Sequence, residues 1–137
     1  MEKTIFHKIL RGDIPCHKIY EDDKTFVFLD INPATKGHML VIPKQFSQNI
    51  FDVDKKTLSA LITTCKRMAN RAKNMLDCDG CNILQSSEEV AEQDVPYIHF
   101  HVIPRYEKDS FNIWSSRKGN PEELGNVQSL LRYENTR

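Results

Sequence analysis

Residues 97–104 read Tyr-Ile-His-Phe-His-Val-Ile-Pro, with apolar residues at every second position. Because successive side chains of a β-strand point to opposite faces, this period of two predicts a strand with two different faces. His99 and His101 share one face, about 7 Å apart along the strand. The other face is apolar and is expected to pack on the core. It consists of Ile98, Phe100 and Val102.

Four other segments have the composition of strands and are bounded by turn residues. They are residues 17–21, 25–29, 38–42 and 81–85. The first two are separated by Asp22-Asp23-Lys24 and are expected to form a hairpin, and Pro43 is expected to end the third. Together with residues 97–104 they predict a five-stranded sheet.

Helices are predicted before, between and after these strands. Apolar residues recur every three or four positions over residues 54–76, which predicts a long amphipathic helix, and a shorter run predicts a helix over residues 4–10. Asn120 and Pro121 are typical of the cap and first turn of a C-terminal helix. Strands joined by a hairpin, followed by a long helix and two more strands, indicate an α+β domain with an antiparallel sheet.

The length and the net charge of the chain exclude some classes of protein. The 137 residues suffice for a single domain, expected to span residues 1–137, and no apolar run approaches the ~20 residues of a membrane-spanning helix. The 19 basic residues balance 19 acidic ones, which argues against a nucleic-acid-binding protein that works through bulk charge. The first residues lack the apolar stretch of a signal peptide, so we expect a cytoplasmic protein without membrane or nucleic-acid partners.

The four cysteines, at positions 16, 65, 78 and 81, are expected to be reduced. Cys78 and Cys81 have Cys-x-x-Cys spacing, but a zinc site would need a second such pair. A redox site would place the pair at the start of a helix that follows a strand. This pair instead follows the long predicted helix and enters a strand, so we expect neither metal nor redox chemistry there.

The histidine pair has three interpretations. With His38, which opens another predicted strand just after a glycine, His99 and His101 could form a metal site. Alternatively, one neutral imidazole could act as a nucleophile while its neighbours fix its tautomer and donate protons. The third interpretation is a pair of polar residues on a solvated sheet face. The spacing alone leaves all three open.

Several motifs together make the chain similar to the histidine triad (HIT) family, and in particular to its nucleotide-binding Hint branch. The family's hallmark, histidines that alternate with apolar residues, is matched at residues 99–105. The other matching motifs lie at residues 5–9, 13–15, 20–23, 28–33 and 37–44. This resemblance covers most of the chain, and the motifs together are far more specific than a histidine pair alone.

The resemblance implies a HIT-like fold, a homodimer whose sheets join into one, and a pocket for a purine nucleoside monophosphate. His99 takes the position of the family's nucleophile, which forms a covalent nucleotidyl intermediate that water resolves. His101 and His38 match the histidines that orient this nucleophile and handle protons. The reaction needs no metal or other cofactor, because histidines and backbone donors meet the charge on the phosphoryl oxygens.

The resemblance also assigns the nucleotide pocket. Asp30 falls where the family binds the ribose hydroxyls, which suits a carboxylate that accepts two hydrogen bonds. Gln93 and Asp94 belong to the loop that approaches the phosphate, and Gln93 is the residue best suited to touch it. The residues at the positions that sandwich the base are Ile5, Phe6, Ile9, Phe28 and Ile31. For each of these five, core packing is an equally good interpretation.

The sequence departs from the family at the triad and at the phosphate loop. Tyr97 replaces the first histidine of the triad, and its hydroxyl is expected to lie on the same face as His99. Glu88 and Glu92 replace two glycines of the loop. A carboxylate about 4 Å from a phosphate costs about 1 kcal/mol in water and ~4 kcal/mol at an effective dielectric constant of about 20. Inward-facing glutamates would therefore weaken nucleotide binding.

A third departure concerns a structural zinc that some bacterial relatives hold. The positions of its two cysteine ligands are occupied here by Thr4 and His7, and the position of its mid-chain histidine ligand by Phe46. A site with most of its ligands replaced cannot complete a tetrahedral coordination shell. We therefore expect no structural zinc.

The leading hypothesis is a nucleotide hydrolase or nucleotidyl transferase that cleaves at the α-phosphorus of purine nucleotide conjugates, of the phosphoramidate or dinucleoside polyphosphate type. The alternative is a catalytically impaired purine-nucleotide-binding protein, because Tyr97 and the acidic loop depart from the family. The third is a metalloprotein built on the three histidines. The sequence leaves open the leaving group, the base, and whether the segment 107–137, with Trp114, covers its own pocket or that of a partner.

Overall fold

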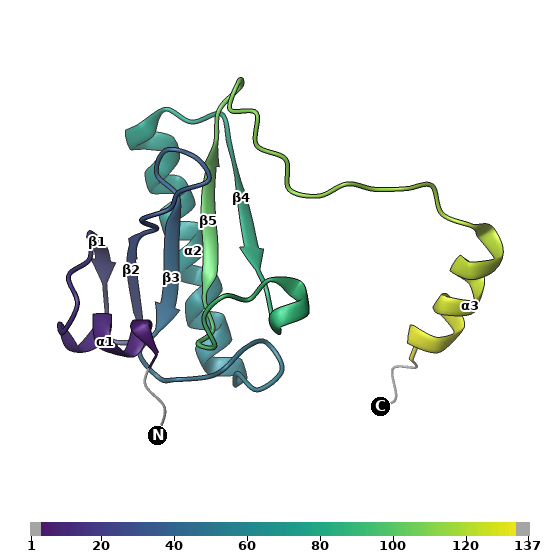
Figure 1. The fold of residues 1–137 in the computed structure, drawn as a ribbon, viewed down its shortest axis with the longest axis horizontal. Helices are drawn as coiled ribbons and strands as arrows, with labels where there is room; N and C mark the ends of the chain where they lie inside the picture. The colour runs from purple at the N-terminus through teal and green to yellow at the C-terminus, as the bar shows by residue number, and fades with distance from the viewer. Residues whose placement is uncertain (1–3, 134–137) are drawn as a thin grey trace.

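The computed structural model describes residues 4–133 and has the α+β architecture that the sequence predicts (Figure 1). One antiparallel sheet has the strand order β1-β2-β3-β5-β4. Its strands are β1 (Lys18–Glu21), β2 (Thr25–Leu29), β3 (Met39–Pro43), β4 (Gly80–Gln85) and β5 (Phe100–Arg105). The predicted five-stranded sheet is confirmed.

The helices begin where side chains cap them. They are α1 (Ile5–Arg11), α2 (Lys55–Leu76) and α3 (Pro121–Leu131), with a short 3-10 turn η1 (Glu89–Ala91) before β5. The Thr4 hydroxyl accepts two backbone N–H groups of α1, the Asp54 carboxylate accepts one from α2, and the Asn120 side chain accepts two from α3. Such caps satisfy donors that have no partner within the helix. The helices predicted from the periodicity are confirmed.

The α2 helix covers one face of the sheet (Figure 1). The predicted core face of β5 lies here, since Ile98, Phe100 and Val102 are buried against it. The other buried members of this cluster are Val27, Met39, Val41, Leu61, Cys65, Met68, Ala72 and Cys78. Cys65 and Cys78 carry free thiols, and burial raises the pKa of Cys65 to about 12, so it packs as an apolar side chain.

The opposite face of the sheet packs against α1. The buried residues of this second cluster are Phe6, Ile9, Phe26, Phe28, Leu40, Ile42 and Tyr97. The helix covers the β1-β2-β3 side of the sheet and leaves the β5 side of this face to the loop that precedes β5 (Figure 1). The predicted histidines lie at this boundary, where the His99 ring contacts Phe6.

Several predicted strand ends are off by one residue, and the start of the last strand is off by three. The last strand begins at Phe100 rather than at residue 97, because the Tyr97 N–H donates to the Val95 carbonyl and the Ile98 N–H donates to the Ser47 carbonyl, each at 2.8 Å. The segment before Phe100 is thus bound to loops instead of to a neighbouring strand. Pro43 belongs to β3 as its last residue, opposite Thr25, whereas it was expected to lie outside the strand.

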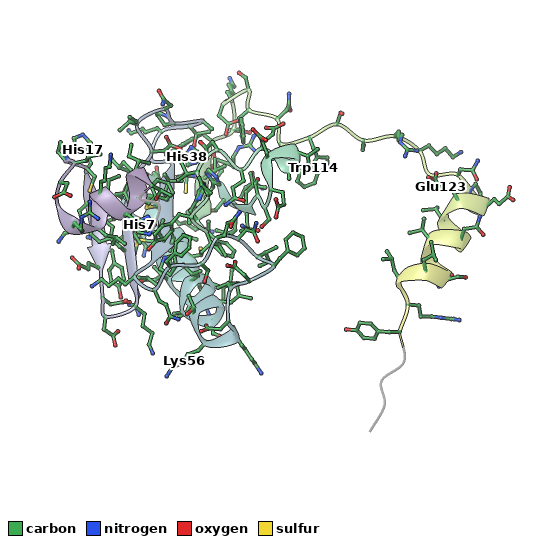
Figure 2. The ribbon with its side chains drawn as sticks, turned by 60° about the horizontal axis from the view of Figure 1, so that its bottom comes forward. His7, His17, His38, Lys56, Trp114 and Glu123 are labelled. Carbon is green, nitrogen blue, oxygen red and sulfur yellow. The ribbon has the colours of Figure 1, made fainter. Side chains whose placement is uncertain are left out.

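The C-terminal arm leaves the body after β5 and ends in α3, which stands apart from the sheet (Figure 1). Figure 2 shows Trp114 on the segment that leads to the helix and Glu123 on the helix itself. The apolar residues of α3 are exposed; they are Leu124, Val127, Leu130 and Leu131. Within residues 4–133, no helix has the length and apolar character needed to span a membrane.

Candidate active site

The three predicted histidines converge at the boundary of the second cluster. His38 directly precedes β3, His101 lies in β5 opposite Leu40 of β3, and His99 directly precedes β5. The ring centroids of His38 and His101 are 5.1 Å apart, and so are those of His99 and His101. His38 and His99 are buried, with 6% and 2% of their surfaces exposed, and His101 is partly buried.

One hydrogen bond determines the tautomer of His99. Its Nδ1 atom lies 2.8 Å from the backbone carbonyl of Tyr97. A carbonyl oxygen only accepts, so Nδ1 carries the proton and donates it. In the neutral ring, Nε2 therefore keeps a free lone pair. The ring lines a cavity, and it packs edge-on against Phe6 with the centroids 5.0 Å apart. A held ring with a free lone pair is what nucleophilic attack requires.

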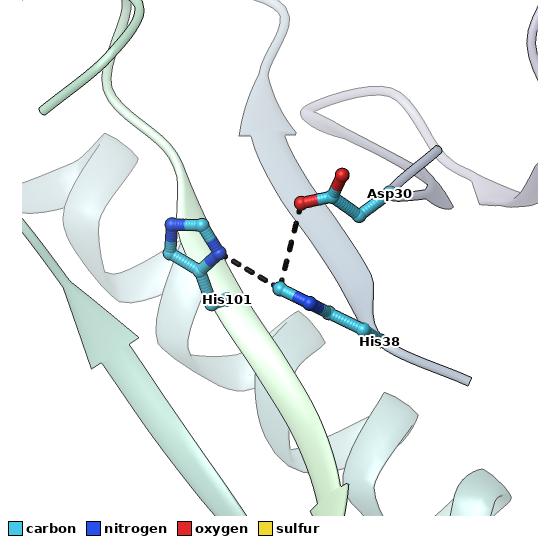
Figure 3. A group of neighbouring side chains, drawn as sticks. All are labelled: Asp30, His38 and His101. Carbon is cyan, nitrogen blue, oxygen red and sulfur yellow. Dashed lines mark hydrogen bonds and ion pairs between the residues drawn. The ribbon is translucent and has the colours of Figure 1, made fainter. Parts of the chain in front are cut away.

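His38 and His101 form a hydrogen-bonded relay (Figure 3). The Ala34 N–H donates to His38 Nδ1 at 2.9 Å, so the proton of the neutral ring lies on Nε2. His38 Nε2 is 2.9 Å from His101 Nδ1 and donates to it, which leaves the proton of His101 on its own Nε2. Burial lowers the pKa of both rings, and for His101, with His99 and His38 beside it, to about 4. Both rings are thus neutral near pH 7, and His101 is a proton donor.

Asp30 completes a group of side chains that could hold a cation. Ligand atoms of Asp30, His38 and His101 lie within 4.8 Å of one another, and Asp30 Oδ2 is 3.7 Å from His38 Nε2 (Figure 3). A cation on His38 Nε2 would move the proton of that ring to Nδ1, where it would face the Ala34 N–H. The group therefore fits a proton relay better than a metal site. The metal hypothesis requires His99 as a ligand, but this group of side chains contains Asp30 and not His99.

A cavity of about 200 Å³ lies beside the histidines. Its walls include Asp30, Asp94, His99 and His101. They also include every residue predicted to sandwich the base: Ile5, Phe6, Ile9, Phe28 and Ile31. Phe6, Ile9 and Phe28 also belong to the buried cluster, so these side chains both pack in the core and line the cavity. Base contact at these positions stays a prediction.

The two glutamates of the loop do not line this cavity. Glu88 and Glu92 have φ angles of 80° and 71°, in the region that favours glycine. The Glu88 carboxylate accepts a hydrogen bond from the Asn49 side chain at 2.9 Å. It is thus engaged with the loop around Asn49. The carboxylate that approaches the histidines is that of Asp94, whose Oδ1 is 3.5 Å from His99 Nε2.

Gln93 braces the same loop. Its Oε1 accepts the Glu88 N–H at 2.8 Å, and its Nε2 donates to the carbonyls of Gln48 and Val95 at 2.7 and 3.0 Å. The predicted phosphate contact of Gln93 would require it to give up one of these bonds. Its present role is to fix the loop that carries Asp94.

Tyr97 supports His99 in a way that the sequence could not reveal. Its hydroxyl donates to the Pro43 carbonyl, while its own backbone carbonyl holds His99 Nδ1. Tyr97 lies on the same face as His99, as expected, but its hydroxyl is bonded to Pro43 and not to the His99 ring. Burial raises the pKa of Tyr97 to about 12, so the hydroxyl stays protonated. Backbone groups such as this carbonyl and the Ala34 N–H have no sequence signal.

The positions of the zinc ligands in some relatives form an aromatic contact here. Thr4 and His7 are joined in a capping box at the start of α1. The His7 ring packs on Phe46 and Tyr97, with centroid distances of 5.0 and 4.9 Å. These side chains therefore have a packing role that links α1 to the loop after β3.

Known proteins resemble this chain over most of its length. The family model described as HIT domain matches residues 11–108. An uncharacterized HIT-like protein of Borreliella burgdorferi is 41% identical over 124 residues, which cover 89% of each chain. An adenosine 5′-monophosphoramidase of Saccharomyces cerevisiae is 33% identical over 129 residues, which cover 93% of this chain and 79% of the yeast protein.

The fold has a close counterpart among solved structures. The crystal structure of a HIT family member from Bacillus subtilis matches with a TM-score of 0.86 at 35% sequence identity. The match covers 98% of this chain and 100% of the other. It therefore reaches beyond residue 108, where the match to the HIT domain model ends, and includes α3.

Proposed function

This chain belongs to the HIT domain family, and on that basis we propose that it is a nucleotide hydrolase or nucleotidyl transferase acting at the α-phosphorus of purine nucleotide conjugates. The observation that carries the proposal is the state of His99. Its Nδ1 is held by a backbone carbonyl, so that its Nε2 lone pair is free beside a cavity. The substrates are conjugates of the phosphoramidate or dinucleoside polyphosphate type.

The reaction follows from the tautomers of the three rings. His99 Nε2 attacks the α-phosphorus, a phosphorus–nitrogen bond forms, and the bond to the leaving group breaks. The proton on His101 Nε2 passes to the departing atom, while His38 keeps its Nε2–H and stabilises the resulting charge on His101 through the hydrogen bond to Nδ1. Water then attacks the nucleotidyl-histidine, releases the nucleoside monophosphate and restores the protons.

The rest of the nucleotide is placed by the cavity walls. The base lies among the apolar side chains of α1 and β2, where Phe6 and Phe28 form the buried part of the wall. Asp30 accepts hydrogen bonds from the ribose hydroxyls through the side of its carboxylate that does not face His38. This arrangement directs the α-phosphate toward His99.

The test is turnover of an adenosine monophosphate–amine conjugate by the purified protein. Substitution His99→Ala should abolish turnover, and mass spectrometry of the wild-type protein quenched during turnover should find a nucleotidyl group on His99. His17→Ala, at an exposed histidine that does not line the cavity, is the matched control and should retain activity. Activity that survives His99→Ala would refute the assigned nucleophile.

A second candidate function is purine-nucleotide binding without turnover. The observation that favours it is the Asp94 carboxylate, 3.5 Å from the atom that must attack phosphorus. A phosphate would have to displace this carboxylate or tolerate its charge. Calorimetry with adenosine monophosphate beside the turnover assay separates the two functions, because the second predicts saturable binding with no product.

We further propose the homodimer that the family resemblance implies. β4 is an edge strand of the sheet, and edge strands present unpaired backbone groups that another chain can bind. Pairing of β4 with a second copy would extend the sheet across the two molecules. Analytical ultracentrifugation tests this, and a monomer at micromolar concentration would contradict it.

A further inference from the structure

The cavity beside the histidines is negatively charged. Within residues 4–133, its lining includes two carboxylates, Asp30 and Asp94, and no lysine or arginine. Asp30 is engaged at the ribose end, where Oδ1 accepts the Asn32 N–H at 2.8 Å and Oδ2 lies 3.7 Å from His38 Nε2. Asp94 stands at the other end, beside the nucleophilic atom of His99. A phosphate group bound in this cavity would therefore face a carboxylate, whereas anion-binding sites place a positively charged group at such a position.

Within residues 4–133, the polar contact of the Asp94 carboxylate is with His99 Nε2 alone. In the neutral His99 ring, Nε2 carries a lone pair, so the 3.5 Å contact with Asp94 Oδ1 brings two acceptors together and is not a hydrogen bond. Its side chain is 79% exposed, whereas the neighbouring Gln93 is tied to the loop by three hydrogen bonds. The loop thus holds residue 94 beside His99 while its side chain remains exposed to water.

We propose that Asp94 is a specificity-determining residue that selects nucleotide conjugates by the charge of their leaving group. Conjugates with a neutral or cationic leaving group are accepted, and those with an anionic leaving group are disfavoured. This inference rests on the proposed function, because it assumes that a nucleotide α-phosphate lies next to His99. The residue acts through its charge and takes no part in bond making or breaking.

The size of the effect follows from Coulomb's law at an exposed site. A leaving-group charge within about 7 Å of the carboxylate changes affinity by about threefold in water, more where the loop excludes water. A cationic and an anionic leaving group should therefore differ by about tenfold in affinity.

The experiment uses three matched ligands that the protein cannot readily cleave. They are alkyl esters of adenosine monophosphate with the same chain, ending in an ammonium, a hydroxyl or a carboxylate group. Calorimetry on the full chain should give affinities in the order ammonium, hydroxyl, carboxylate, with about a tenfold span. In Asp94→Asn the three affinities should fall within twofold of one another, with the carboxylate ligand gaining most.

Two references make the result specific. Glu92→Gln removes the same charge from an exposed loop residue that does not line the cavity, and it should keep the tenfold span. Adenosine should bind wild type and Asp94→Asn equally, because it carries no phosphate. A flat series in wild type, or an unchanged span in Asp94→Asn, would overturn the role of Asp94 while adenosine binding still supports the pocket. If adenosine itself does not bind, the nucleoside pocket is wrong and the charge selection falls with it.

Discussion

The two faces of the sheet use their buried side chains differently. The face against α2 is filled by aliphatic, aromatic and cysteine side chains, and a hydrogen bond of 2.8 Å between Thr25 and Thr64 joins two of its buried hydroxyls. The face against α1 is packed less continuously, because a cavity and three histidines lie beside its buried cluster. Backbone groups fix the Nδ1 atoms of His99 and His38, and His38 Nε2 is bonded to His101 Nδ1.

This difference indicates where stability and chemistry reside. Burial of apolar area is the main stabilising term, and the α2 face supplies the continuous layer that provides it. The α1 face can then hold buried imidazoles in specific tautomers without supporting the fold alone. Substitutions on the first face should lower the free energy of unfolding, and substitutions on the second should change function.

The largest expected effect on stability is at the centre of the α2 face. Leu61 is fully buried, so Leu61→Ala should lower the free energy of unfolding by about 2–5 kcal/mol, from lost burial and the cavity that remains. Denaturant titration measures this change. Nucleotide affinity of the folded fraction should stay within twofold of wild type. A large loss of affinity at temperatures where the variant is folded would show that the two faces are coupled.

A smaller effect on stability is expected at Tyr97, in the cluster of the α1 face. Tyr97→Phe leaves the buried Pro43 carbonyl without its donor and should cost about 1–3 kcal/mol of unfolding free energy. Turnover should be preserved, because the backbone carbonyl that holds His99 remains. Tyr106→Phe is the matched control: its hydroxyl donates to the Lys36 carbonyl at the surface, and its loss should cost less. A drop in turnover for Tyr97→Phe alone would assign the hydroxyl a catalytic role.

The histidines of the α1 face should make stability depend on pH. Burial lowers the pKa of His101 to about 4 in the folded chain, while an unfolded histidine has a pKa near 6.5. The unfolded state therefore binds more protons between these values, so the free energy of unfolding falls as the pH falls from about 6.5 toward about 4.

His101→Gln should flatten this part of the pH profile measured by denaturant titration. His17→Gln, at an exposed position, should leave it unchanged. Equal slopes in wild type and His101→Gln would mean that other groups carry the acid sensitivity.

The sequence predicts which side chains lie on each face of the sheet better than it predicts the loops at the ends of the strands. A side-chain period of two assigns Ile98, Phe100 and Val102 to one face whatever the loops do, and this survives even though β5 begins at Phe100. The direction of Asp94 depends on loop torsions, and Glu88 holds a φ angle of 80° that its residue type disfavours. Neither is encoded in local composition. The tautomer of His99 depends on a backbone carbonyl, which any residue supplies.

The smallest expected effect belongs to α3, which lies on neither face. Leu130 is 84% exposed, so Leu130→Ser should change the free energy of unfolding by less than about 0.5 kcal/mol. An 11-residue helix that contains a glycine is only marginally stable in water by itself. The substitution therefore tests whether the exposed apolar side of α3 is covered by another molecule. Thermal unfolding at two protein concentrations checks it. A loss of stability that grows with protein concentration would mean that a second molecule covers α3, and the arm would then belong to the folded core of the assembly.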